Sequence, residues 1–483
     1  MQDLNLTRGL SELDRALALQ QLASVTPDEN KYTTETDAVR PFLSATAEWK
    51  ACASFQRILL RTRATFGKAE QRHVHEVTRA LKKIDPLNMS LLEKKVTKHD
   101  QLAVVEEIGR HVSPETKALL HPGTTSYDPL DTIRAYLLRR CWDKVFRPKV
   151  QEVVSKLCTI AEQTLDILQT GRTHLQNTSP VLFGGYVASY AARLADRSST
   201  VDRAIRNLKG KVSGIVGTGA SIDAVIGEGT SLQFEEAVLK KLGLEADLTA
   251  SQVTAKERFA DLGHAVVSLM TVLGNFADDM RILYSAAINE ITSRASATRL
   301  GGSSADAAKD NPIHWENIAG KVAVVESGMR VLYEMMHTNL QRDLRSSVQA
   351  RYQPGGMIAE TYESFHRASK ALDELSLNRD KIAQNLEAVR RFPSEAMVAI
   401  MRSHGWIHSD HGVGHDAVKV FSQKAKASGQ PLLEVAIQDP DFSSFYAKLS
   451  DRERRILNGE LELYTGSARE RATRNIAYAR MTA

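Results

Sequence analysis

The sequence predicts an all-α protein built around a bundle of long helices. Between Pro180 and Pro312 it contains no proline, and so long a proline-free stretch permits long uninterrupted helices. Apolar residues recur there at helical spacing, whereas the alternation typical of strands is scarce. Several long amphipathic helices can bury their apolar stripes only in a bundle, formed by one chain or by several.

The clearest helix is predicted to begin at Phe259. Apolar residues follow a three-four spacing over four heptads, which corresponds to about 40 Å of helix at roughly 1.5 Å per residue. The positions are Phe259, Leu262, Val266, Leu269, Leu273, Phe276, Met280, Leu283 and Ala287. Further helices are predicted over 150–164, 180–209 and 313–345. An elongated coiled-coil rod is disfavoured because glycine-rich loops interrupt the pattern.

Composition is that of a soluble globular protein. The chain has 483 residues, of which 42% are hydrophobic and 25% charged. Its net charge of +5 fits anionic substrates, but no stripe of basic and aromatic residues indicates nucleic-acid binding. The three cysteines lack metal-ligand spacing, so we predict neither disulfides nor a zinc site. Because no signal peptide or membrane-length apolar run is evident, we expect a cytoplasmic protein without membrane contact.

We divide the chain into three helical domains. These are an N-terminal domain over 1–120, a central long-helix domain over 121–365 and a C-terminal domain over 366–483. Five polar stretches interrupt the predicted helices. They are the candidates for chemistry, and each also has a plain structural explanation.

Two of these stretches come before predicted helices. "TKHD" places His99 beside Asp100, and taken alone this pattern favours an ordinary surface pair over a functional one. "LLHPGTTSYDPLDT" combines His121 and several hydroxyls with a helix start that Asp128 or Asp131 could cap. Free N–H groups and hydroxyls at a helix start can bind an anion, and simple capping is the alternative.

Two further stretches lie between long helices. "TGRTHLQNTSPVLFG" places Arg172, Thr173, His174 and Gln176 between two apolar helices. A buried core histidine is the ordinary explanation for His174, but so many polar groups need partners, which a ligand can supply. "GKVSGIVGTGASI" (210–222) can approach a ligand closely or be a plain loop, and it lacks the pattern of a P-loop.

The fifth stretch, "GGSSADAAKDNP" (301–312), resembles a loop around a reactive hydroxyl. A serine acts as a base only where its alkoxide is stabilised, and Lys309 could do so in a water-poor site. The composition alone favours a flexible surface loop. Asp306 lies three residues after Ser303, where a carboxylate facing the site would repel a dicarboxylate substrate.

Taken in order, these stretches resemble the fumarase/aspartase superfamily, whose members eliminate an amine or a hydroxyl from a succinyl group to release fumarate. The loop is similar to the signature GSSxMPxKxNP, and within the superfamily the branch of adenylosuccinate lyases is the most similar. The matching positions are His99-Asp100, residues 121–132, residues 172–184, Gln252 with Arg258, residues 302–312, and Arg342, Ser347 and Arg351.

The resemblance implies a homotetramer of three-domain helical chains, with active sites assembled from three chains. It also implies β-elimination, in which a base removes a proton next to a carboxylate and an acid protonates the departing nitrogen. By resemblance Ser303 is the base, while Lys309 and Asn311 stabilise the developing negative charge. His174 would be the general acid, and Glu316 would orient its imidazole.

The resemblance also implies a nucleotide-succinyl substrate site. His121 would orient the substrate, and Thr125 and Ser126 would bind a carboxylate. The phosphate and ribose side would consist of Lys31, Tyr32, His99, Arg342, Ser347 and Arg351. Asp100, Gln252 and Arg258 complete the predicted substrate site. Neither a metal nor an organic cofactor is implied.

The chain departs from the family pattern in several places. Asp306-Ala307 replaces Met-Pro, and losing the proline loosens the loop. Lys31 replaces an arginine, which keeps the charge but loses bidentate geometry. Arg345 stands where a small residue is expected, and "GWIHSDHGVGHDAV" replaces a C-terminal element.

Three functions remain open on these grounds. The first is that of an adenylosuccinate lyase, which releases AMP and also serves the succinyl-carboxamide ribotide step. The second is that of a sister lyase for another succinyl or nitro-succinyl compound. The third is that of a binding protein without catalysis. His174 separates it from the similar carboxymuconate cycloisomerases, which usually have Trp at that position. Because the reactive residues are retained together, we predict an active lyase that needs no cofactor.

Overall fold

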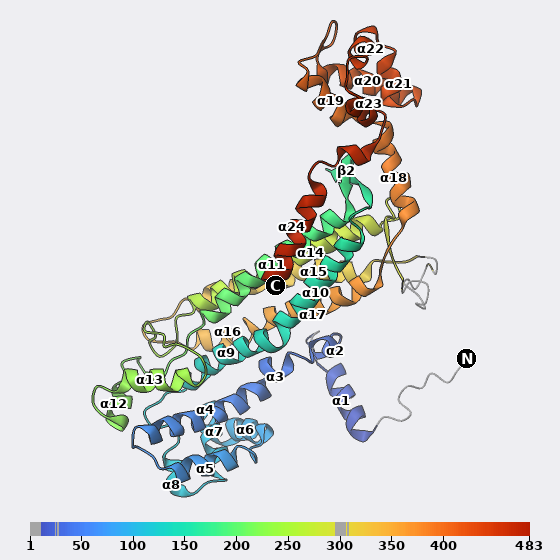
Figure 1. Cartoon of the computed structure of the whole chain (residues 1–483). Helices are drawn as coiled ribbons and strands as arrows, with labels where there is room; N and C mark the ends of the chain where they lie inside the picture. Colours follow the sequence, from blue (N-terminus) through green and yellow to red (C-terminus); the bar gives the residue numbers. More distant parts are fainter. Residues whose placement is uncertain (1–10, 25, 27–28, 295–305, 307–308) are drawn as a thin grey trace. The chain divides into compact units, whose positions relative to one another are not determined.

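The computed structural model describes residues 11–24, 26, 29–294, 306 and 309–483 (Figure 1). Within these residues the structure is mainly helical, and its strands form only three two-stranded antiparallel sheets, β1–β2, β3–β4 and β5–β6. The predicted all-α class is therefore confirmed.

The chain forms two compact units, each assembled from separate segments. The first unit comprises residues 1–150, 197–271 and 320–367, and the second comprises 151–196, 272–319 and 368–483. Five long helices contribute residues to both units. They are α10 (Arg147–Gln163), α11 (Phe183–Arg206), α14 (Glu257–Tyr284), α15 (Ile313–Met335) and α17 (Gly355–Glu374).

The other helices of the first unit lie wholly within it. They are α1 (Glu12–Leu22), α2 (Thr33–Thr36), α3 (Arg40–Leu43), α4 (Ala45–Thr65), α5 (Gln71–Ala80), α6 (Pro86–Leu92), η2 (Glu93–Thr97), α7 (Asp100–Gly109), α8 (Pro114–Ala118), α9 (Tyr127–Cys141), η3 (Trp142–Phe146), α12 (Ala220–Ile226), α13 (Ser231–Lys240) and α16 (Arg345–Gln349).

The second unit adds the short strands and the C-terminal helices. They are β1 (Leu168–Thr173), β2 (Gln176–Leu182), β3 (Ile291–Ser293), β4 (Leu375–Leu377), α18 (Arg379–Arg391), α19 (Ser394–Ser403), β5 (Ile407–His408), β6 (Gly412–Val413), α20 (Gly414–Ser428), α21 (Leu432–Ile437), α22 (Pro440–Tyr446), α23 (Asp451–Leu457), η4 (Leu461–Tyr464) and α24 (Ala468–Thr482).

All four predicted long helices are present, with one clear difference in length. The helix predicted over 313–345 is α15, which ends at Met335. Beyond it Leu340 has a φ of 52°, and the Asp343 carboxylate accepts the Asn339 N–H at 3.2 Å. A left-handed residue and a local side-chain bond both compete with helix, so the polar segment after Met335 turns instead.

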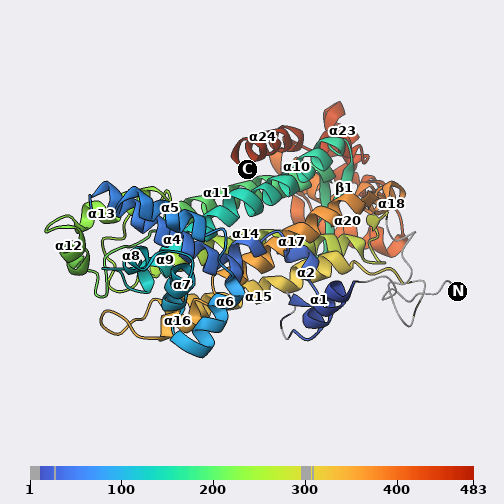
Figure 2. The same cartoon turned by 90° about the horizontal axis from the view of Figure 1, so that it is seen from below.

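In the second unit, aromatic contacts hold three of the long helices together. The Phe276 ring on α14 lies 5.1 Å from Tyr190 on α11 and 5.6 Å from Trp315 on α15, between ring centroids. The Tyr186 hydroxyl on α11 also donates to the Asp279 carboxylate on α14 at 2.6 Å. Figures 1 and 2 show these helix segments side by side. The apolar stripe read from the sequence is therefore buried here between helices.

Helix α14 departs from one expectation. By length and composition alone it is apolar enough to cross a membrane, contrary to the prediction that no run qualifies. Of its most apolar window, 61% is buried inside the protein. A core helix of a soluble protein passes the same test, because helix packing and lipid select similar apolar residues.

In the first unit, buried ion pairs fix the start of α9. The predicted caps Asp128 and Asp131 are wrong, because α9 begins at Tyr127 with Ser126 at its N-cap. Both carboxylates instead bind lysines: Asp128 pairs with Lys211, and Asp131 pairs with Lys256 at 2.6 Å. Since a buried carboxylate needs a cation, tertiary pairing overrides the capping preference.

We predict that Phe276→Ala lowers the free energy of unfolding by about 3–5 kcal/mol, because it removes a buried ring that joins three helices. Thr271→Ala, at an exposed position of the same helix, should change it by less than about 0.5 kcal/mol. Urea unfolding of the two variants measures the difference. Equal losses would show that the ring contacts do not hold the helices.

Candidate functional site

His174 lies at the tip of a β-hairpin. Strands β1 and β2 are joined by the two residues His174 and Leu175, with φ angles of 53° and 58°. Two positive φ values in a two-residue connection are those of a type I′ turn, which usually takes Asn-Gly. The structure therefore exposes His174 rather than burying it in the core. Holding non-glycine residues in this conformation costs free energy and is typical of functional sites.

Strand β1 is held next to the turn by Glu290, a residue that no motif in the sequence marks. Glu290 accepts two hydrogen bonds from the Arg172 guanidinium, at 2.6 and 3.1 Å. Its partner is more than a hundred residues away in the chain, so no local pattern marks it. Arg172, in the polar stretch around His174, is thus bound by Glu290, which follows α14 in the chain.

The structure describes only part of the signature loop. Ser303 lies outside the described residues. Asp306 and Lys309 are exposed, and the Lys309 N–H donates to the Asp306 carbonyl oxygen at 3.2 Å. The Tyr284 hydroxyl donates to the Asp310 carboxylate, which ties the end of α14 to the residue between Lys309 and Asn311.

The other two predicted catalytic groups of the second unit lie at the start of α15. Asn311 is half-buried directly before this helix, and Glu316 is exposed in its first turn. The Glu316 N–H donates to the Pro312 carbonyl oxygen at 3.0 Å, so both residues belong to one rigid helix start.

His99 in the first unit contacts the hydroxyl stretch. Its Nδ1 accepts the Leu102 N–H at the start of α7, at 3.4 Å. The proton therefore belongs on Nε2, which lies 2.9 Å from the Ser126 hydroxyl oxygen. His99 therefore links the start of α7 to the hydroxyl stretch, which the surface-pair interpretation did not predict.

His121 is held in a half-buried position. Its Nδ1 lies 3.0 Å from the Thr124 hydroxyl oxygen and 3.3 Å from the Gln56 side-chain nitrogen. Its φ of 68° is left-handed. Burial lowers the pKa of His121, although the Asp128 carboxylate opposes this. A neutral imidazole can both donate and accept a hydrogen bond, which suits an orienting role.

The hydroxyl stretch and the glycine-rich stretch meet at Asp128. One oxygen of this carboxylate accepts the Thr125 N–H at 2.6 Å. The other accepts the N–H groups of Ser213 and Gly214 at 3.1 and 3.3 Å and pairs with Lys211. Both paired side chains are 0% exposed. Lys211 is therefore a structural residue that organises the site region, and the sequence did not single it out.

Gln252 and Arg342 lie together beside the same helix start. The Arg342 guanidinium donates to the Gln252 side-chain oxygen at 2.9 Å and lies 4.2 Å above the centre of the Tyr127 ring. Arg258 instead pairs with the buried Asp247 at 3.1 Å. Arg342 and Gln252 are thus oriented as a pair, with the guanidinium over the Tyr127 ring, whereas Arg258 binds the Asp247 carboxylate.

Ser347 and Arg351 line a cavity of about 410 Å³ in the first unit, together with Asp100. Charged side chains form part of its wall, including Arg134, which pairs with Glu48 at 2.9 Å. A cavity of this size with a few polar groups is typical of a small-molecule site.

The remaining predicted residues occupy other positions. Lys31 is exposed, and the Tyr32 ring lies 4.3 Å from the Lys321 ammonium nitrogen on α15 and 5.5 Å from the Arg367 guanidinium on α17. Arg345 is exposed and pairs with Asp343 at 2.6 Å. Tyr32 and Arg345 therefore both contact other residues of the first unit.

One group of described residues has metal-like ligand spacing, away from these predicted residues. It consists of Glu70, His73 and Glu115. Arg72 already pairs with both carboxylates, at 3.0 and 2.7 Å. The Arg72 guanidinium therefore already binds both carboxylates of this group.

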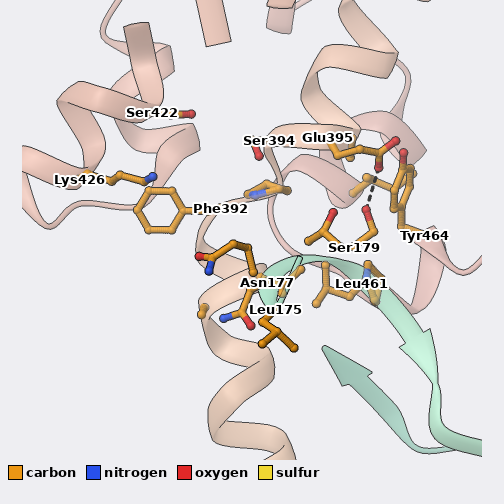
Figure 3. A pocket seen from close by; sticks show the side chains of 18 residues that line it. Leu175, Asn177, Ser179, Phe392, Ser394, Glu395, Ser422, Lys426, Leu461 and Tyr464 are labelled. Atoms are coloured by element: carbon orange, nitrogen blue, oxygen red, sulfur yellow. Dashed lines mark hydrogen bonds between the residues drawn. The ribbon is translucent and has the colours of Figure 1, made fainter. Parts of the chain in front are cut away.

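A second cavity, of about 400 Å³, lies in the second unit beside the hairpin (Figure 3). Residues of the hairpin, from Leu175 to Pro180, form one wall, and the end of α18 and the start of α19 form another. The Ser179 hydroxyl donates to the Glu395 carboxylate on α19 at 2.9 Å. Strand β2 of the hairpin is therefore anchored to α19 at this cavity.

The predicted residues thus fall into two sets. His174, Lys309, Asn311 and Glu316 belong to the second unit, and the other described ones belong to the first. The sequence profile of the Lyase family matches residues 25–326. The chain belongs to this lyase family. It is a carbon–nitrogen lyase of the fumarase/aspartase superfamily.

Known relatives of this lyase cover most of the chain. The adenylosuccinate lyase of Archaeoglobus fulgidus is 26% identical over 452 residues, which are 92% of this chain and 97% of the relative. That of Aquifex aeolicus is 27% identical over 376 residues, covering 76% and 83%.

Solved structures share the fold of this lyase. The 3-carboxy-cis,cis-muconate lactonizing enzyme of Pseudomonas putida has a TM-score of 0.80 at 20% identity, covering 92% of this chain and 97% of its own. A fumarate lyase of Mesorhizobium sp. BNC1 has a TM-score of 0.77 at 21% identity, covering 91% and 97%.

We predict that His121 makes the first unit less stable in mild acid. Its lowered pKa means that, below the ordinary value of 6.5, the unfolded chain binds a proton that the folded chain does not. Stability should fall with decreasing pH there, by at most about 1.4 kcal/mol per pH unit from this group.

The measurement is urea unfolding at pH 7.5 and 5.5. His121→Gln should reduce the loss between the two pH values, whereas His75→Gln, at an exposed position, should not. An unchanged loss in His121→Gln would contradict the prediction.

Proposed function

We propose that this lyase eliminates fumarate from adenylosuccinate to give AMP, and from the succinyl-carboxamide ribotide precursor in the same way. The observation that carries the proposal is the presentation of His174 on a strained, exposed hairpin turn. An elimination with a nitrogen leaving group needs such an acid. The relatives named adenylosuccinate lyase, which match up to 92% of the chain, support this choice of substrate.

The chemistry is a β-elimination assisted by charge stabilisation. Ser303, as an alkoxide, removes a proton from the carbon next to a carboxylate. Lys309 and Asn311 stabilise the negative charge that develops on that carboxylate, where fixed donors contribute most. His174 then protonates the departing nitrogen while Glu316 orients its imidazole.

The first unit supplies the substrate-binding groups. The Arg342 guanidinium keeps free donors beyond its bond to Gln252 and can bind an anionic group. Thr125, Ser126 and His121 flank the same helix start and would orient the succinyl carboxylates. Ser347 and Arg351 would hold the phosphate and ribose at the adjoining cavity.

We also propose that the enzyme is a cytoplasmic homotetramer with shared active sites. The resemblance of the polar stretches to the family, in which active sites are assembled from three chains, supports this proposal. Light scattering of the purified protein measures the mass of the assembly.

One observation favours a second candidate, a lyase for a related succinyl or nitro-succinyl compound. Asp306 replaces an apolar residue of the family signature and is exposed next to Lys309. A carboxylate at this position changes the charge that a dianionic substrate meets. A panel of succinyl compounds separates the two candidates.

We predict that the purified protein releases fumarate from adenylosuccinate, measured by absorbance. Ser303→Ala and His174→Gln should each lower kcat by at least about a hundredfold, as expected for removal of a general acid or base. His337→Gln, at an exposed position, is the matched control and should retain full activity. A parent protein that is folded but inactive on adenylosuccinate would contradict the proposed substrate.

We further predict that Arg342→Lys raises KM by about 10- to 100-fold with a smaller effect on kcat, because a charge-assisted hydrogen bond to a ground-state group is lost. Arg345→Lys, three residues further on and paired with Asp343, should change KM by less than about twofold. A similar KM for the two variants would exclude Arg342 from substrate binding.

A further inference from the structure

We propose that Glu290, through its buried ion pair with Arg172, is the positioning residue that holds the hairpin carrying His174. The inference rests on the proposed role of His174 as the general acid. Neither Glu290 nor Arg172 touches the reacting atoms in this proposal. They act by fixing the strand that leads to the imidazole.

The Glu290 carboxylate is fully satisfied by groups from two other parts of the second unit. Its side chain is 0% exposed. Arg172 binds both oxygens, Gln169 donates to one of them at 2.6 Å, and Asn385 donates to the other at 2.9 Å. Four charge-assisted hydrogen bonds in a buried site leave this carboxylate one orientation.

A bulge in β1 makes this arrangement possible. Residues three apart on a regular strand point to opposite faces of the sheet. Gln169 and Arg172 nevertheless reach the same carboxylate, because the register shifts between Thr170 and Arg172. Gly171 lies at this shift, where a Cβ atom would approach the Ser179 carbonyl oxygen to 2.5 Å. The bulge therefore re-aims Arg172 toward Glu290, as bulges next to active sites do.

Glu290 itself is held by regular structure. Its carbonyl oxygen accepts the Asn378 N–H at 2.9 Å, and the following strand β3 pairs with β4. Asn385, which binds the carboxylate, also donates to the Ile288 carbonyl oxygen at 2.9 Å. The anchor of the hairpin is thus a sheet and the helix α18, both outside the hairpin.

The ion pair is better suited to orientation than to stability. A buried ion pair contributes little net stability compared with well-packed apolar residues, whereas a bidentate arginine fixes both direction and distance. Arg172 precedes His174 by two residues, about 7 Å along the strand. An error in the direction of Arg172 therefore moves the imidazole directly, and small misplacements of a reacting group lower kcat strongly.

The test compares Arg172→Lys with Arg480→Lys. The second variant changes another bidentate arginine of the same unit, which pairs with Glu162 on α10 at 2.7 Å rather than with a residue of the hairpin strands. We expect Arg172→Lys to lower kcat by about tenfold or more with KM within about twofold, and Arg480→Lys to leave both unchanged.

A double-mutant cycle separates positioning from general damage. If Arg172 acts through His174, Arg172→Lys should have little further effect on kcat in the His174→Gln enzyme, because the acid it positions is absent. An equal loss of kcat in both backgrounds would overturn the proposal.

Hydrogen exchange gives a readout that does not depend on the substrate. Arg172→Lys should speed exchange of the amides of residues 168–182 and leave those of α11 unchanged, while Arg480→Lys should not affect the hairpin. Unchanged exchange in the hairpin would overturn the positioning role even if the enzyme acts on another succinyl compound. Inactivity on adenylosuccinate with faster hairpin exchange would overturn only the proposed substrate.

Discussion

A carboxylate removed from water must be given a cation and hydrogen-bond donors, and the site regions of both units depend on this constraint. In the first unit Asp128 gathers the hydroxyl stretch, the glycine-rich loop and Lys211. In the second unit Glu290 joins strand β1, through Arg172, to helix α18, through Asn385. Each pair joins segments far apart in the chain, so a few buried charges decide where the polar stretches lie.

The long helices supply the frame and the short segments between them supply the chemistry. The hairpin connects α10 to α11, and the predicted signature loop leads into α15. Functional groups on connections held by rigid elements are the common arrangement in enzymes. In this chain every predicted catalytic residue that the structure describes lies at a helix start, in a turn or in a loop.

Two of the predicted functional histidines, His121 and His174, have positive φ angles. Such a backbone conformation is unfavourable for a side chain with a Cβ atom, so surrounding contacts must maintain it. His121 has Thr124 and Gln56 beside its ring, and His174 has the paired strands of its hairpin. Strain that is maintained by packing keeps each imidazole in one place, which a reacting or orienting group requires.

The sequence by itself determined the helices and the family. Helical periodicity and the absence of proline act within a few residues, so the stripe from Phe259 predicted α14 well. The order of the polar stretches was also sufficient to indicate a lyase. Only the tertiary structure decided the partners of Arg172 and Asp128 and the exposure of His174. Those outcomes depend on which distant charges are buried together, and no local pattern in the chain records that choice.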